Sequence, residues 1–266
     1  MTTIKRLLAL ILLGCMLCPA AQAATPTPPP VEIEQEELDA PEMILDFLDI
    51  AYNEWDTLAG KTLKKVNKFT EWRGKGVGFG WCGGYFPWCM MQAGMPMEEL
   101  DYFTKNAGKD GFLPVQGLMH VKEASVGKIM RGYQVMNRAT NVPQEGYLLV
   151  YGCSYNKTIH IALVYDVSAL GDGKFRITTL EGNMSNRVKM YVHDYDMYAE
   201  DKENNLSLVP EEEWELPESD MVDYSIPKAK PSNSAGKKFP YYVNTFLMTW
   251  VPGDEMNELT TPTPAP

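Results

Sequence analysis

The stretch that decides the fold runs from Tyr147 to Val192 and reads YLLVYGCSYNKTIHIALVYDVSALGDGKFRITTLEGNMSNRVKMYV. It contains short runs that are rich in β-branched and aromatic residues, at 147–153, 159–167, 174–180 and 187–192. Turn-forming segments separate the runs: SYNK at 154–157, GDG at 171–173 and NMSN at 183–186. Such a pattern predicts consecutive β-strands, and the later run 241–251 is predicted to be a further strand.

The sequence before this stretch has helical periodicity. Apolar residues recur at helical spacing in 43–53, a weaker helical pattern covers 61–72, and another helix is predicted for 82–93. Gly94 and Pro96 follow that last helix and form a usual stop signal. Helices followed by consecutive strands predict an α+β fold, in which N-terminal helices pack on an antiparallel β-sheet.

The N-terminus resembles a secretory signal peptide over residues 1–23. Lys5 and Arg6 precede the apolar run 7–18, and Ala-Gln-Ala at 21–23 is a small-x-small cleavage site. The residues before Cys15 also resemble a lipoprotein box, which would acylate Cys15, but the apolar run continues past it, so we favour ordinary cleavage. We therefore expect a secreted, extracellular or wall-associated protein with no transmembrane segment in its mature form.

Composition divides the remaining chain into one domain and two linkers. Residues 24–42 form a Pro/Thr/Glu-rich linker, 43–252 have globular character, and 253–266 form a Pro/Thr-rich tail. Within the domain, 201–238 is rich in Glu, Lys, Pro and Ser, which predicts a surface insertion that Trp214 and Tyr224 partly anchor.

Charge and cysteine content exclude several classes of protein. The 266 residues are 45% hydrophobic and 22% charged, which is typical of a globular chain and not of a disordered or collagenous one. The net charge of −11 disfavours nucleic-acid binding, because that binding needs clustered Lys and Arg. Five cysteines are too few for a disulfide framework. The three that follow the predicted cleavage site, Cys82, Cys89 and Cys153, form no CxxC pair, so a metal site is not expected. We expect no cofactor and a monomer.

Cys82 is a candidate nucleophile. It follows the glycine-rich segment 74–80 and stands at the predicted start of the helix 82–93. A helix N-terminus favours a thiolate, and its free N–H groups can hold an oxyanion in acyl transfer. The alternative is a buried structural cysteine. Cys89, seven residues later on the same helix face, is predicted to lie in the core, and Cys153 is predicted to be buried or paired with Cys89.

His160 is the best candidate for a base among the three histidines, because it opens the strand IHIALVYDV after a polar turn. His193 is predicted to face solvent, and His120 to lie in a helix. An imidazole base needs a group that orients its second nitrogen. Glu181 and Asn183 are two residues apart at the end of the next strand, so one or both are predicted to contact His160, although EGN is also a plausible turn.

Three motifs in this order, WCGGYFPWCMMQAG, IHIALVYDV and ITTLEGNMSNRV, resemble the CHAP domain of bacterial cell-wall hydrolases over about residues 43–195. This cysteine- and histidine-dependent amidohydrolase/peptidase family belongs to a papain-like clan. The resemblance implies that Cys82 is the nucleophile, His160 the general base, and Glu181 and Asn183 the assisting polar groups. It also implies cleavage of peptidoglycan amide bonds, as an N-acetylmuramoyl-L-alanine amidase or a peptide endopeptidase.

Pro87 departs from the family pattern, since a small or polar residue usually stands there. Proline removes an N–H and crowds the carbonyl four residues back, which belongs to Gly83. Gly83 and Gly84 are expected to relieve the strain, or the helix starts later; either outcome could shift Cys82. Two alternatives to hydrolysis therefore remain: a non-catalytic wall-binding protein with the same fold, and an acyltransferase that uses the same thioester chemistry.

Overall fold

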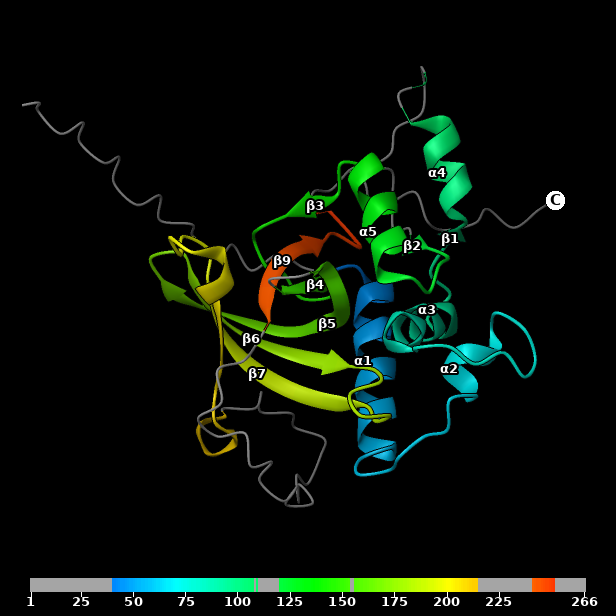
Figure 1. Ribbon diagram of the computed structural model, residues 1–266, viewed down its shortest axis with the longest axis horizontal. Coiled ribbons are helices and arrows are strands. Elements are labelled where there is room, and N and C mark those ends of the chain that lie inside the picture. Colours follow the sequence, from blue (N-terminus) through cyan, green and yellow to red (C-terminus); the bar gives the residue numbers. More distant parts are fainter. Residues whose placement is uncertain (1–39, 108, 110–119, 154–155, 215–240, 252–266) are drawn as a thin grey trace, which may run out of the picture. The chain divides into compact units, whose positions relative to one another are not determined.

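The computed structural model describes residues 40–107, 109, 120–153, 156–214 and 241–251 (Figure 1). The helices are α1 (Glu42–Thr57), α2 (Lys68–Glu71), α3 (Cys82–Gln92), α4 (Leu100–Asn106) and α5 (Val126–Val135). The strands are β1 (Met97–Glu98), β2 (His120–Val121), β3 (Ala139–Thr140), β4 (Leu148–Cys153), β5 (Asn156–Gly171), β6 (Lys174–Glu181), β7 (Lys189–Asp196), β8 (Leu206–Leu208) and β9 (Tyr242–Leu247). The predicted signal peptide and C-terminal tail lie outside the described residues.

An antiparallel sheet forms the centre of the fold. Within the described residues it has seven strands in the order β3-β9-β4-β5-β6-β7-β8, while β1 and β2 form a separate parallel pair. Figure 1 shows α1, α3 and α5 gathered on one side of β4 to β7. The predicted α+β class with an antiparallel sheet is therefore confirmed.

The helices bury the faces that their sequence pattern predicts. In α1 the residues Ile44, Phe47, Leu48 and Ala51 are buried, and they follow the stripe predicted for 43–53.

The prediction for 61–72 is largely wrong, because only α2 is helical there. The Asn67 side chain accepts a hydrogen bond from the Phe69 N–H (2.9 Å) and caps the helix at Lys68, whereas Lys64, Lys65 and Val66 are exposed.

Further corrections concern His120 and the insertion. His120 lies in β2, not in a helix, and is fully buried with its Nδ1 2.8 Å from the Tyr133 hydroxyl. The first part of the predicted insertion, 201–238, belongs to the sheet, because β8 pairs with β7. The Trp214 Nε1–H donates to the Val209 carbonyl (3.0 Å), as an anchor would. Tyr224 lies outside the described residues.

Cys89 is part of the core, as predicted, and burial raises the pKa of its thiol well above the usual value. Neither Cys89 nor Cys153 forms a disulfide; both are free and buried. Cys89→Ala is expected to lower the free energy of unfolding by about 1–3 kcal/mol, since it leaves a small cavity beside α3. Urea unfolding followed by circular dichroism measures this loss. A midpoint equal to that of the wild type would show that the Cys89 thiol is not required for packing.

Candidate functional site

Cys82 is the first residue of α3, as the sequence predicts. Its side chain is partly exposed, and its Sγ lies 3.9 Å from the Gly80 carbonyl oxygen. The N–H groups of Gly84 and Tyr85 donate to the Trp81 carbonyl, but among the described residues the N–H groups of Cys82 and Gly83 have no backbone acceptor. These two donors and the helix dipole can therefore stabilise negative charge next to the Cys82 sulfur.

Close packing fixes the first turn of α3. A Cβ on Gly83 would lie 2.1 Å from the Ala124 carbonyl oxygen, and one on Gly84 would lie 2.6 Å from the Phe69 carbonyl oxygen. Only glycine allows the backbone of the neighbouring segments to approach this closely. Pro87 lies inside α3 and is buried, and the helix still begins at Cys82. The alternative of a later helix start is therefore wrong.

Gly83→Ala tests this packing. The new methyl group would overlap backbone, which cannot rotate away, so we expect a loss of about 1–3 kcal/mol in the free energy of unfolding. Gly127→Ala is the matched control, because its Cβ would lie 3.5 Å from the Thr158 Oγ1, an ordinary contact, and alanine favours the helix α5. Equal urea midpoints for the two variants would refute the close approach at Gly83.

His160 lies on β5, directly opposite Tyr151 of β4, and is 8% exposed. Its Nε2 is 2.9 Å from Oε2 of Glu181. The register accounts for this contact: Leu163 pairs with Leu180, so Glu181 stands opposite Ala162, two residues from His160 on the same face of the sheet. The predicted contact between Glu181 and the His160 ring is therefore present.

The environment of His160 favours its charged form. Burial lowers its pKa, but interactions with Cys82 and with the Glu181 carboxylate outweigh burial and raise the pKa to about 9. The imidazole is consequently protonated at neutral pH. An imidazolium that hydrogen-bonds a cysteine stabilises the thiolate.

Glu181 is the centre of a buried polar cluster. It is 0% exposed, and its Oε1 accepts hydrogen bonds from the Tyr151 hydroxyl (2.6 Å) and the Thr179 Oγ1 (3.0 Å). The Nε2 of His193 lies 3.7 Å from the same oxygen and 3.1 Å from the Tyr151 hydroxyl. Burial alone would raise the pKa of Glu181, but the hydrogen bond with His160 and the nearby His193 ring hold it well below its usual value. The carboxylate therefore stays ionised.

The prediction that His193 faces solvent is wrong. His193 is 0% exposed, and the sequence analysis also missed Tyr151 and Thr179. The apolar alternation Val188, Met190, Val192 assigns His193 to the opposite face of β7, but that face is buried as well. Thr179 and Glu181 stand on one face of β6, and the alternation of polar residues there is the only sequence signal for the cluster.

Asn183 lies near the site but not at the imidazole. It has φ 64°, in the left-handed region, within the turn after β6. A Cβ on Gly80 would lie 3.9 Å from its Nδ2, so the Asn183 amide borders the segment that leads to Cys82. The hydrogen bonds of the described residues do not join it to His160. Of the predicted pair, only Glu181 orients the ring.

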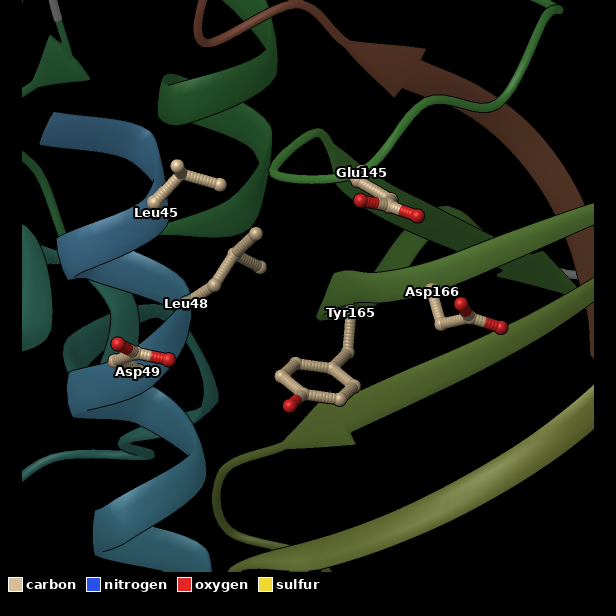
Figure 2. Close-up of a pocket in the computed structure, with 6 residues that line it drawn as sticks. All are labelled: Leu45, Leu48, Asp49, Glu145, Tyr165 and Asp166. Atoms are coloured by element: carbon tan, nitrogen blue, oxygen red, sulfur yellow. The ribbon is translucent and has the colours of Figure 1, made fainter. Parts of the chain in front are cut away.

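A separate acidic pocket of about 220 Å³ opens between α1, the segment before β4 and the middle of β5 (Figure 2). Its lining residues are Leu45, Leu48, Asp49, Glu145, Tyr165 and Asp166. Burial raises the pKa of both Glu145 and Asp166, and the charge of Asp166 raises that of Glu145 further. The lining includes no cysteine or histidine, so the pocket offers no nucleophile of the kind found at α3.

Further features of the described residues bear on cofactors and membranes. In this part of the chain no group of three or more His, Cys, Asp or Glu side chains is arranged to hold a metal ion. Among the same residues, no helix combines the length and the apolar character needed to cross a membrane.

Comparisons with family models, with curated proteins and with solved structures found no match to this chain.

Proposed function

We propose that this chain is an exported cysteine amidohydrolase with a papain-like fold, which cleaves amide bonds in peptidoglycan. One observation carries the proposal: the start of α3 presents the partly exposed Cys82, and His160, which interacts electrostatically with Cys82, is held by the buried Glu181 carboxylate 2.9 Å away. A cysteine, a histidine and an orienting acid are the parts that nucleophilic acyl transfer requires.

The proposed reaction has two halves. Cys82 and His160 start as a thiolate and an imidazolium, because the thiol proton has already passed to His160, and the thiolate attacks the amide carbonyl to give a tetrahedral oxyanion. The N–H groups of Cys82 and Gly83 stabilise that oxyanion. His160 then gives its proton to the leaving amine, the C–N bond breaks, and a thioester remains. Water, deprotonated by His160, attacks the thioester, which releases a carboxylic acid and restores the thiolate and the imidazolium.

The buried cluster explains why the imidazolium can form in a site with little water. Glu181 supplies the negative charge next to the ring, and Tyr151 and Thr179 donate to its second oxygen. These donors fix the carboxylate in one orientation, so it does not rotate away from His160. Glu181 therefore acts by positioning and by charge stabilisation, without a proton transfer of its own.

The choice of peptidoglycan rests on the resemblance of the three motifs to CHAP domains and on the signal-like N-terminus. Both favour a substrate outside the cytoplasmic membrane. The proposal covers an N-acetylmuramoyl-L-alanine amidase and a peptide endopeptidase, since the same acyl chemistry serves either bond.

Purified peptidoglycan provides the test. The protein is incubated with it under reducing conditions, new amino groups are counted, and the soluble fragments are identified by mass spectrometry. We expect new amines in equal number to new carboxylates, and the fragment masses name the bond. Binding without new amines would favour the non-catalytic alternative. Joined fragments in place of hydrolysed ones would favour acyl transfer to an amine.

A further inference from the structure

Positive charge is concentrated in the segment that precedes Cys82. Residues 61–80 hold six of the 24 Lys and Arg residues but only one of the 35 acidic residues, Glu71. The chain as a whole carries a net charge of −11. The segment is therefore opposite in sign to the rest of the molecule.

Most of these charges are available to a ligand. Lys61, Lys64, Lys65 and Lys75 are exposed, and no ion pair joins them to an acidic residue within the described part of the chain. The other two are already partnered: Lys68 pairs with Glu54, and Arg73 lies 2.9 Å from Glu123.

Arg187 extends the same surface from the turn after β6. Its Nε donates to the Thr62 Oγ1 (3.1 Å), and the Leu63 N–H donates to the Asn186 carbonyl (2.8 Å). We call the exposed side chains of this surface the basic loop; they are Lys61, Lys64, Lys65, Lys75 and Arg187.

The segment 61–80, which carries the four lysines, is cyan in Figure 1 and runs beside α3. The Trp72 Nε1–H donates to the Gly84 carbonyl (3.2 Å), which ties the segment to the first turn of the helix. A Cβ on Gly78 would lie 3.2 Å from Cγ of Lys65, so the two arms of the loop touch each other. The segment that carries these lysines is therefore packed against the helix that begins at Cys82.

We propose that the basic loop binds carboxylates of the peptidoglycan strand that is being cleaved, and so selects an anionic substrate for the Cys82 site. The inference rests on the proposed function and names the charge that the substrate must carry next to the scissile bond. Acidic charge elsewhere on the protein repels such a polymer, and the lysines of a segment packed against α3 draw it to one face. This attraction acts over about a Debye length, roughly 10 Å at 0.1 M salt.

The position of the basic loop favours the substrate, and not a membrane surface, as its ligand. An anionic bilayer on the basic loop would cover the partly exposed Cys82, whereas an anionic segment attached to the scissile amide would bring that amide to it. Val66 and Val77, which are 40% and 42% exposed, stand among the lysines and can contact the aliphatic parts of a peptide stem.

Binding is measured with the purified Cys82→Ala protein, so that hydrolysis does not alter the polymer. The probe is peptidoglycan stripped of phosphate polymers, pelleted with the protein at 50 and 500 mM NaCl. A second sample of the same peptidoglycan has its carboxylates amidated by a carbodiimide, and phosphatidylglycerol vesicles form a further arm. The basic-loop variant is Lys64→Glu/Lys65→Glu/Lys75→Glu, and the charge-matched control is Lys105→Glu/Lys109→Glu/Lys174→Glu, at exposed lysines elsewhere.

We expect the basic-loop variant to lose about ten-fold or more in affinity at 50 mM NaCl and the control to lose less than about three-fold. Amidated peptidoglycan and 500 mM NaCl should each remove that difference. Equal affinity of the two variants, or undiminished binding to amidated peptidoglycan, would overturn the inference, and so would binding to the vesicles alone. Circular dichroism confirms that both variants are folded. Amine release by the wild-type protein is measured separately. A failure of the proposed function can therefore be distinguished from a failure of this binding inference.

Discussion

Cys82→Ala should abolish amine release from peptidoglycan, with a fall in turnover of at least about 10⁴-fold. The thiol is the only nucleophile that the proposed site presents, and neither His160 nor Glu181 can form the thioester in its place. Folding should be unchanged, because the Cys82 side chain is partly exposed at the first residue of α3. The measurement is the rate of new amino groups, with the urea midpoint recorded for the same samples.

Iodoacetamide labelling gives an independent check on the same residue. Cys82 should be alkylated rapidly at neutral pH, whereas Cys89, which is 0% exposed and whose pKa is raised by burial, should not react in the folded protein. Cys89→Ala serves as the control and should retain activity. Full activity of Cys82→Ala, or labelling of Cys89 in preference to Cys82, would remove Cys82 from the mechanism.

Glu181→Gln should lower turnover by roughly 10²-fold or more, the usual scale for disturbing a general base. The amide has the size of the carboxylate but lacks its charge, so the imidazolium of His160 loses the partner 2.9 Å away. Glu145→Gln is the matched control, since it makes the same change at the separate acidic pocket and should leave turnover nearly unchanged.

The pKa of the His160 ring is a second measurement that tests the effect of Glu181→Gln. In the wild type the pKa of His160 is about 9, and it should fall in Glu181→Gln. Burial lowers this pKa, and the variant lacks the carboxylate charge that opposes the effect of burial. The raised pKa also stabilises the fold below about pH 6.5, and this contribution is lost as the pH rises through about 9. An NMR titration of the imidazole measures both proteins. An unchanged His160 pKa in the variant would show that Glu181 does not control the ring.

The sequence predicts those parts of the site that depend on local pattern. A glycine-rich segment followed by an apolar helical stretch places Cys82 at a helix start, and Gly94 ends that helix with φ 74°. The GDG turn predicts the hairpin that brings His160 near Glu181, but two register shifts, between Val164 and Asp166 and between Ala169 and Gly171, set the final pairing, and the sequence does not predict them.

The rest of the site depends on which surfaces the tertiary fold covers. His193 follows an apolar alternation that predicts one buried face of β7, and nothing local indicates that the other face is buried too. Tyr151 belongs to a continuous apolar run, in which a tyrosine with a buried partner cannot be distinguished from a core aromatic residue. Both errors arise because alternation identifies one buried face and gives no information about the second.

The position of β9 has a consequence for the order in which the chain can fold. Residues 242–247 occupy the place between β3 and β4, although they are made after every other described strand. Until they arrive, β4 is an open edge strand, and Tyr151 lacks the neighbour Val243 that pairs with it. Contacts between such distant parts of a chain form slowly. A ribosome that stops before Tyr242 would therefore release a chain with an uncovered strand beside His160, so the sheet around the site is complete only after residue 247 has been made.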